Sequence, residues 1–345
     1  KKMYITGGLG ARHQGESFGN NYELPNLTAY NETCAAIANV YWNQRMFLLH
    51  GDAKYIDVLE RTLYNGLISG VSLKGDAFFY PNCLASDGKY KFNQGALTRQ
   101  PWFDCSCCPS NIIRFMPSVP GYIYAVKDNN IYVNLFIASG AQIKIPGNSI
   151  KISQESNYPW DGKIKIKVKP DEPGRFSLKI RIPGWADNQP VPGDLYRYEN
   201  ENPETYTLTL NGKQVSYDIE RGYASIEREW SENDEIELNL LMPVHQVLAN
   251  EKVEADRGKA ALTRGPIVYC VEGIDNNNHV FDLVIPNETE FQAGYQKNLL
   301  GGIVTISGKV KNISGKDRII RAIPYYAWSH RGPGEMTVWL NRENN

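Results

Sequence analysis

Hydrophobic residues follow two different spacings along this chain, and the spacing changes near residue 125. Before that point they recur every three to four residues, which is typical of helices with one buried face. Helices are predicted over residues 27–49 and 54–67, and a third is predicted to start beside Cys108. Pro109 suits the first position of that third helix, and Pro117 ends it.

Beyond residue 125, apolar and polar residues alternate in short segments, which is typical of β-strands with one buried face. Asn211 and Gly212 follow one such segment and predict a tight hairpin turn. The predicted strands cover residues 131–137, 163–168, 176–182, 205–210, 235–241, 266–271, 325–328 and 336–340. Strands at this spacing predict an antiparallel β-sandwich, jelly-roll-like in its connections.

The predicted fold class is therefore multidomain, with an α region followed by all-β regions. We place the domain boundaries after residues 124 and 273. Residues 1–124 form the helical domain, residues 125–273 form the β-sandwich domain, and residues 274–345 form a C-terminal β region that packs on the sandwich.

The composition is that of an ordinary soluble globular protein. Its 345 residues are 42% hydrophobic and 22% charged, with a formal net charge of -1 at pH 7. The lack of a basic block argues against a nucleic-acid partner, and no apolar run approaches the roughly 20 residues of a membrane helix. No signal-peptide core follows Lys1, so either there is no signal or the N-terminus lies upstream. The compartment stays open between cytoplasm and bacterial periplasm, and a homo-oligomer stays open too.

Three of the six cysteines fall within four residues, at Cys105, Cys107 and Cys108. Such a cluster indicates metal binding, redox chemistry or catalysis, because thiolates are strong ligands and strong nucleophiles. The alternative is three small buried side chains, but adjacent cysteines cannot both point into one core from a regular strand. Cys107 and Cys108 stand beside a predicted helix N-terminus, where the helix dipole favours the thiolate.

Two acidic residues are candidates to share the site. Glu16 lies between small residues in a glycine-rich loop, from which it can reach into a pocket, although a solvated loop carboxylate is the alternative. Glu32 and Cys34, with Cys107 and Cys108, would supply four metal ligands. Residues two apart on a helix do not face each other, so this set requires either an irregular backbone over residues 31–34 or a later helix start.

The chain resembles glycoside hydrolase family 127, whose best-known members are β-L-arabinofuranosidases. The resemblance rests on several motifs in order: MYITGG (3–8), GESFG (15–19), YELPN (22–26), AYNETCA (29–35), ERTLYNG (60–66), CSCCP (105–109) and IPYYAW (323–328). It implies a retaining glycoside hydrolase that releases L-arabinofuranose, or a related sugar, from an oligosaccharide or glycan. It also implies that residues 1–124 are the C-terminal part of an (α/α)6 barrel that carries the active site.

The same resemblance implies roles for individual residues. Cys107 matches the nucleophile and Glu16 matches the general acid/base. Zinc is the implied cofactor, and Glu60 and Tyr80 match positions expected to contact the sugar. The implied zinc ligands are Glu32, Cys34, Cys107 and Cys108, and no role is implied for Cys105.

One departure from the family pattern is large. A complete barrel needs about twelve helices, and only three are predicted before the sandwich, so the chain is expected to be the C-terminal portion of a larger protein. Half a barrel would leave apolar helix faces uncovered, which puts activity of the chain alone in doubt. Two alternatives remain: a non-catalytic carbohydrate-binding protein with a structural zinc, and a thiol redox protein. The second lacks the two-residue spacing of a thioredoxin-like motif.

Overall fold

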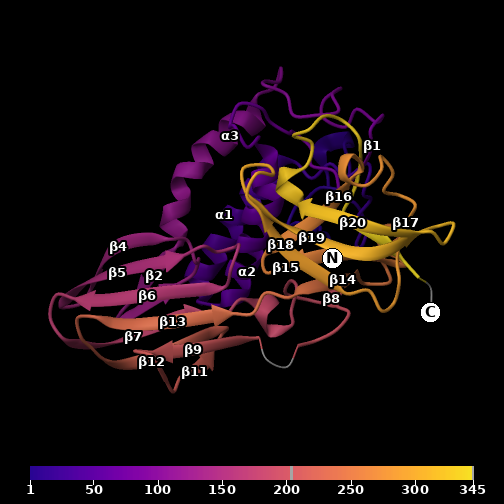
Figure 1. Ribbon diagram of the computed structural model, residues 1–345. Helices are drawn as coiled ribbons and strands as arrows, with labels where there is room; N and C mark the ends of the chain where they lie inside the picture. The colour runs from indigo at the N-terminus through magenta and orange to yellow at the C-terminus, as the bar shows by residue number, and fades with distance from the viewer. Residues whose placement is uncertain (203–204, 344–345) are drawn as a thin grey trace.

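The computed structural model describes residues 1–202 and 205–343, and the fold is mostly β with few helices. The α-helices lie in the first 115 residues: α1 (Thr33–His50), α2 (Ala53–Arg61) and α3 (Cys107–Phe115). The later strands form two groups in Figure 1, one at lower left that is labelled β4 to β7, β9 and β11 to β13, and one at right that is labelled β14 to β20. The helices stand at the junction between the two groups of strands.

Helix α1 starts later than the sequence pattern predicts. It begins at Thr33, not near residue 27, because Asn31 has φ 40° and Glu32 is extended with ψ 139°. It ends at His50, and Gly51, with a φ of 62°, forms a left-handed cap that favours glycine. The prediction of helix over residues 27–32 is wrong, because this segment continues the N-terminal loop and is not helical.

The predicted second helix changes character at Thr62. The α-helix ends at Arg61 and continues as a π-helix over Thr62–Leu67. Asn65 in this segment donates to the carbonyl of Pro266 (2.8 Å). A Cβ at Gly66 would lie 2.9 Å from the carbonyl oxygen of Thr6, so glycine allows the N-terminal loop to pack closely there. The π-helix, whose turns are wider than those of an α-helix, therefore contacts segments that are distant in the sequence. The spacing of apolar residues gives no information about such contacts.

Residues 124–240 contain all the described strands of two sheets. The six-stranded sheet has the order β10-β9-β13-β6-β5-β4, and the five-stranded sheet has the order β11-β12-β7-β3-β2. The inward side chains of both sheets share one buried cluster with Trp230 and Phe176. The bounds are β2 (Tyr124–Lys127), β3 (Asn130–Val133), β4 (Ser139–Ile145), β5 (Asn148–Ser156), β6 (Lys163–Pro170), β7 (Gly174–Arg181), β9 (Tyr206–Leu210), β10 (Lys213–Gln214), β11 (Asp218–Glu220), β12 (Tyr223–Trp230) and β13 (Asp234–Leu240).

The third sheet has eleven strands, and six of them form a closed ring. The ring runs β16-β20-β19-β17-β22-β15 and closes through pairing of β15 with β16, around a separate apolar cluster. Strands from both sides of residue 273 pair here, and the predicted domain boundaries stay predictions. The bounds are β1 (Ala85–Asp87), β8 (Tyr196–Tyr198), β14 (Val244–Ala249), β15 (Lys259–Arg264), β16 (Ile267–Glu272), β17 (Leu283–Ile285), β18 (Phe291–Gln296), β19 (Ile303–Asn312), β20 (Asp317–Pro324), β21 (Glu335–Thr337) and β22 (Trp339–Arg342).

Most of the strand predictions are confirmed. Burial alternates along the whole of β6, and Asn211 and Gly212 turn β9 into β10 with φ of 50° and 72°. The predicted strand 131–137 stops at Val133, because the carbonyl of Asn134 accepts from the buried Arg181 Nε (2.6 Å). Other predictions fail near the C-terminus: residues 325–327 form a 3-10 helix, and the predicted strand 336–340 is divided between β21 and β22.

A buried ion-pair group joins α2 to the five-stranded sheet. Arg181 on β7 is fully buried and pairs with Asp57 (2.6 Å) and Glu60 (2.5 Å). The hydroxyl of Tyr158 also donates to Glu60 Oε1 (2.8 Å). Burial raises the pKa of Asp57 to about 6, although Arg181 acts in the opposite direction. The guanidinium therefore compensates two carboxylates that water does not reach freely.

Removal of this guanidinium should be strongly destabilising. We expect Arg181→Leu to lower the free energy of unfolding by about 3–5 kcal/mol, because it leaves buried carboxylates without a counter-charge. Urea denaturation measures this change. The matched control is Arg175→Leu on the same strand, whose partner Glu227 (2.9 Å) is exposed, so the midpoint should stay nearly unchanged. Equal midpoints for the two variants would contradict this account.

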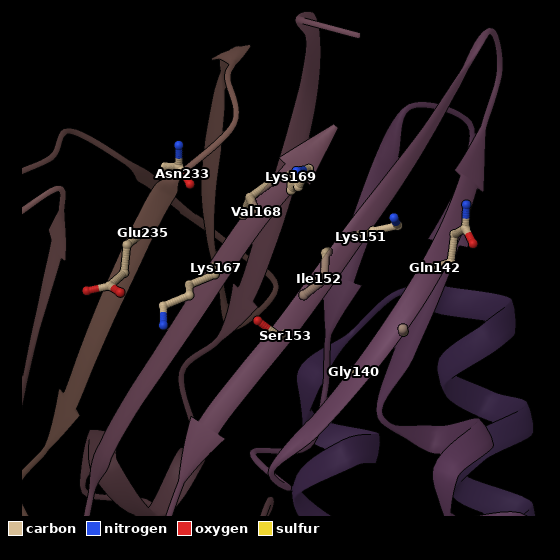
Figure 2. A pocket seen from close by; sticks show the side chains of 11 residues that line it. Gly140, Gln142, Lys151, Ile152, Ser153, Lys167, Val168, Lys169, Asn233 and Glu235 are labelled. Carbon is tan, nitrogen blue, oxygen red and sulfur yellow. The ribbon is translucent and has the colours of Figure 1, made fainter. Parts of the chain in front are cut away.

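The outer face of the six-stranded sheet is polar. A groove of about 700 Å³ runs over β4, β5, β6 and β13, and lysines line part of it (Figure 2). Lys167 pairs with Glu155 (2.6 Å), and Lys169 pairs with Glu232.

Among the described residues, no helix has both the length and the apolar character needed to cross a membrane.

Candidate active site

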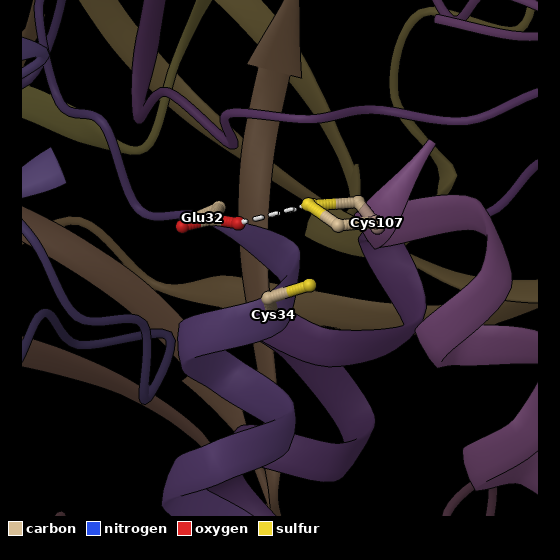
Figure 3. Close-up of side chains that lie close together, drawn as sticks. Glu32, Cys34 and Cys107 are labelled. Carbon is tan, nitrogen blue, oxygen red and sulfur yellow. Dashed lines mark hydrogen bonds between the residues drawn. The ribbon is translucent and has the colours of Figure 1, made fainter. Parts of the chain in front are cut away.

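Four side chains with metal-binding atoms converge where the starts of α1 and α3 meet. Glu32 immediately precedes α1, and Cys34 lies in its first turn, while Cys107 and Cys108 open α3. Their ligand atoms, one carboxylate oxygen and three sulfurs, all lie within 4.8 Å of one another. Figure 3 shows Glu32, Cys34 and Cys107 directed toward a common space between the two helices.

The late start of α1 explains how Glu32 and Cys34 reach the same place. Because Glu32 is extended at the N-cap, its side chain does not follow the helical periodicity that begins at Thr33. The neighbouring backbone is fixed by Asn82, whose side chain donates to the carbonyl of Asn31 (2.9 Å). The sequence left two alternatives, an irregular backbone over residues 31–34 or a later helix start, and both are present: Asn31 has φ 40° and α1 begins at Thr33.

The cluster has a buried side and an exposed side. Cys108 is buried, with its Sγ 3.3 Å from Glu32 Oε1, whereas Cys107 is an exposed residue whose partly buried Sγ lies 3.7 Å from the same oxygen. The two sulfurs are 3.9 Å apart. Cys34 is partly buried, and its Sγ accepts a hydrogen bond from Asn111 Nδ2 (3.3 Å). Cys107 is therefore the thiol of this group that solvent reaches most freely.

The proton affinities of the four acidic groups in the cluster are shifted in different directions. The hydrogen bond from Cys108 lowers the pKa of Cys34 to about 7, and the same contact raises the pKa of Cys108. Burial raises the pKa of Cys107 to about 11 and also raises the pKa of Glu32. Four negative charges this close would repel one another strongly without a cation. Three sulfurs and one oxygen form a donor set that could hold a metal ion.

Tyr80 connects the starts of both helices. Its hydroxyl lies 2.8 Å from Cys107 Sγ, and its carbonyl accepts from the backbone N–H of Thr33 (3.0 Å). Burial raises the pKa of Tyr80, so its hydroxyl keeps the proton and can donate it to a thiolate. Asn93 fixes the position further by accepting from the Tyr80 N–H (2.8 Å).

Glu16 lies in an exposed 3-10 turn, Gln14–Glu16, beside the same cluster. The hydroxyl of Tyr30 donates to Glu16 Oε1 (2.7 Å). The Tyr30 ring lies 6.4 Å from the Tyr80 ring, so two neighbouring tyrosines hold Glu16 and Cys107. Burial, and after it the charge of Glu16, raises the pKa of Glu32, so Glu16 acts electrostatically on a member of the cluster.

Three family models match consecutive parts of the chain. The β-L-arabinofuranosidase, GH127 catalytic domain matches residues 1–121, the β-L-arabinofuranosidase, GH127 middle domain matches residues 130–242, and the glycoside hydrolase family 127 C-terminal domain matches residues 244–341. The chain belongs to glycoside hydrolase family 127. The resemblance inferred from the sequence motifs is confirmed.

Relatives in this family align with nearly the whole chain. The non-reducing end β-L-arabinofuranosidase of Bifidobacterium longum subsp. longum is 34% identical over 373 residues, which cover 99% of this chain and 54% of that protein. A solved GH127 β-arabinofuranosidase has 51% identity and a TM-score of 0.93, and the match covers 99% of this chain and 54% of that chain. A GH127 β-L-arabinofuranosidase from Geobacillus stearothermophilus T6 has 41% identity and a TM-score of 0.90, and the match covers 99% of this chain and 55% of that chain. The chain spans about half the length of these GH127 relatives.

The structure gives Glu60 partners outside the cysteine cluster. Its side chain is 1% exposed and pairs with Arg181 and Tyr158 at the junction of α2 with β7. The sugar contact implied by the family resemblance stays a prediction. The described contacts indicate instead that Glu60 holds α2 against the sheet. Tyr80, the other residue expected to contact sugar, lies beside Cys107.

No role was assigned from the sequence to four residues that border this candidate site. Asn111 lies one helical turn after Cys107, a spacing that could have suggested a shared helix face. Tyr30 precedes Glu32 by two residues, but its bond to Glu16 depends on the path of the loop. His13 packs against Tyr30, with ring centroids 4.9 Å apart. Cys105 is exposed, and its Sγ lies 3.9 Å from the Tyr80 hydroxyl.

Proposed function

We propose that this chain carries the catalytic residues of a retaining glycoside hydrolase that releases L-arabinofuranose from glycans. Cys107 is the nucleophile and Glu16 is the general acid/base. The observation that carries the proposal is an exposed thiol and a carboxylate, held by the neighbouring tyrosines Tyr80 and Tyr30. The printed names of the GH127 relatives, β-L-arabinofuranosidase among them, support the sugar.

Glu32, Cys34, Cys107 and Cys108 would hold a zinc ion. The donor set fits, because a soft, tetrahedral divalent ion is bound by thiolates together with a carboxylate. Bound zinc would supply the positive charge that keeps coordinating thiols deprotonated at neutral pH. Asn111 would orient Cys34 through its amide, as outer-shell hydrogen bonds do at metal sites.

In the first step, the Cys107 thiolate attacks the anomeric carbon while Glu16 protonates the leaving oxygen. The carbon–oxygen bond breaks, a carbon–sulfur bond forms, and the released alcohol takes the proton from Glu16. Tyr80 donates to the sulfur and fixes its direction of attack. Tyr30 fixes the carboxyl of Glu16 in the same way.

In the second step, Glu16 takes a proton from water. The water oxygen forms a bond to the anomeric carbon, and the carbon–sulfur bond breaks to return the Cys107 thiolate. The sugar leaves with its original anomeric configuration, because two displacements occur at the same carbon. Each group of the pair therefore returns to its starting protonation state.

The wider architecture belongs to the same proposal. Residues 1–124 are the C-terminal part of an (α/α)6 barrel, and the sheets that follow form a jelly-roll-like sandwich and a C-terminal β region. The chain covers about half of each relative's length, which supports a further helical segment as the rest of the barrel.

A non-catalytic carbohydrate-binding protein with a structural zinc is less consistent with the cluster. Structural zinc sites are closed, with four protein ligands shielded from solvent. Here Cys107 is exposed and stands beside Tyr80, and the exposed Glu16 serves no structural purpose at a closed site. The exposed thiol favours catalysis.

Hydrolysis of a synthetic β-L-arabinofuranoside tests the proposed function. The assay uses the full reading frame that contains these 345 residues, loaded with zinc, and nuclear magnetic resonance follows the anomeric proton of the product. The proposal predicts release of β-L-arabinofuranose before mutarotation. Release of the α-anomer, or no release by the zinc-loaded protein, would overturn it.

Zinc binding should release protons. At pH 7.5 we expect about two to three protons per zinc, because the raised pKa values keep Cys107 and Cys108 protonated without metal, while Cys34 is partly ionised. Calorimetric titration in two buffers of different ionisation enthalpy measures this number. Magnesium, which prefers oxygen ligands, is the control and should release none. Zinc uptake without proton release would refute this ligand set.

A further inference from the structure

A row of aromatic rings leads from Tyr80, beside the proposed nucleophile, through Tyr30, which holds the proposed acid, and continues beyond Tyr30. The Tyr80 and Tyr30 centroids are 6.4 Å apart, Tyr30 and His13 are 4.9 Å apart, and His13 and Tyr90 are 6.3 Å apart. The last two contacts are edge-to-face, with interplanar angles of 71° and 80°. Such pairs fix ring orientation. Tyr90 ends the row and is 38% exposed, so one of its faces is available to a ligand.

The order of the rings gives the row a direction. Its first member, Tyr80, contacts the nucleophile Cys107, and its second, Tyr30, contacts the acid Glu16. In a retaining glycosidase, the acid stands at the oxygen of the leaving group, so groups beyond the acid face the leaving group. Tyr90 follows Tyr30 in the row by two ring contacts, through His13, and from this order we infer that it stands on the leaving-group side.

We propose that Tyr90, supported by His13, is the stacking platform for the leaving group of the substrate, a sugar ring attached to the released arabinofuranose. This inference rests on the proposed function and makes Tyr90 a residue that determines specificity. Aromatic side chains supply a large apolar face to ring-shaped ligands at low entropic cost. His13 supports the platform as an uncharged ring, since burial lowers its pKa.

The backbone of Tyr90 is held in place by the third sheet. Asp87 Oδ1 accepts from the N–H groups of Lys89 (2.8 Å) and Tyr90 (2.7 Å). Asp87 is the last residue of β1, which pairs with β21 and places Asp87 opposite Glu335. The third sheet thereby positions Tyr90 at the leaving-group side of the site. Strand β21, which pairs with β1 there, lies more than two hundred residues after Tyr90 in the sequence.

Two substrates that differ only in the leaving group test this inference in the full reading frame. One is an arabinofuranosyl disaccharide, and the other is methyl β-L-arabinofuranoside, whose leaving group has no ring. We expect Tyr90→Ala to lower kcat/KM for the disaccharide by about tenfold, the effect of one aromatic contact, and to leave the methyl glycoside unchanged. Tyr90→Phe keeps the ring and should retain the unmodified rate on both.

Trp102→Ala is the matched control. Trp102 is a 57% exposed aromatic residue outside the row, and it precedes in sequence Phe103, whose ring is 5.5 Å from Tyr80. Its removal should leave the ratio of the two kcat/KM values unchanged. An equal loss on both substrates by Tyr90→Ala, no loss on either, or a Tyr90→Phe variant as impaired as Tyr90→Ala would overturn the inference. An unmodified protein that hydrolyses neither substrate would overturn the proposed function itself.

Discussion

Cys107→Ser is expected to lower kcat/KM for an arabinofuranoside by about 10⁴-fold or more, with the fold intact. A serine hydroxyl is a far weaker nucleophile than a zinc-held thiolate, and removal of a catalytic nucleophile typically has an effect of this order. Cys107 is an exposed residue at the start of α3 and is not among the buried residues of that helix, so its substitution should leave the unfolding midpoint of the metal-free protein nearly unchanged. Initial rates and zinc content are measured on the same preparation.

The control for this variant is the neighbouring thiol. Cys105→Ser removes an exposed sulfur two residues away that also approaches the Tyr80 hydroxyl, but at 3.9 Å instead of 2.8 Å. It should keep the activity of the unmodified protein. Full activity of Cys107→Ser, or the same loss in both variants, would contradict the role given to Cys107.

Glu16→Gln is expected to lower activity by about 10²- to 10⁴-fold on a sugar leaving group, the range of general acid–base catalysis. The rate of the first step should fall much less on a dinitrophenyl glycoside, because that leaving group departs without a proton. Azide should restore turnover on the activated substrate, since it attacks the glycosyl intermediate without a base. Steady-state and burst kinetics on the two substrates measure these differences.

Tyr30→Phe is the graded control for Glu16. It removes only the hydroxyl that donates to Glu16 Oε1 and keeps the ring between His13 and Tyr80. About a tenfold loss is expected, since one hydrogen bond to a charged group orients the carboxyl. A Glu16→Gln variant with equal losses on both leaving groups and no response to azide would contradict the acid/base role.

Local pattern predicted the elements of this fold better than their ends. The alternation along β6 and the Asn211 turn follow from nearest-neighbour chemistry, and both are confirmed. The start of α1 and the end of β3 are set by tertiary contacts, for example the bond from Arg181 to the carbonyl of Asn134. Periodicity carries no record of such contacts. The same limit hid the π-helix after α2.

The candidate site was predictable in its residues but not in its supports. Crowded cysteines and nearby acids are visible in the sequence, and the four ligand atoms of the cluster lie within 4.8 Å. The hydrogen bonds of Tyr30 and Asn111 depend on how loops and helix faces meet. Glu60 was expected at the sugar on resemblance alone, and its burial against Arg181 depends on β7, over a hundred residues later.

Trapping of the covalent intermediate tests the central claim most directly. The Glu16→Gln variant is mixed with a dinitrophenyl arabinofuranoside, so that the first step proceeds and the second is slow, and the digested protein is analysed by mass spectrometry. The account predicts one anhydropentose added to the peptide that contains Cys107, located on its sulfur by fragmentation. An adduct on another residue, such as Glu32, or the absence of any adduct during turnover, would contradict it.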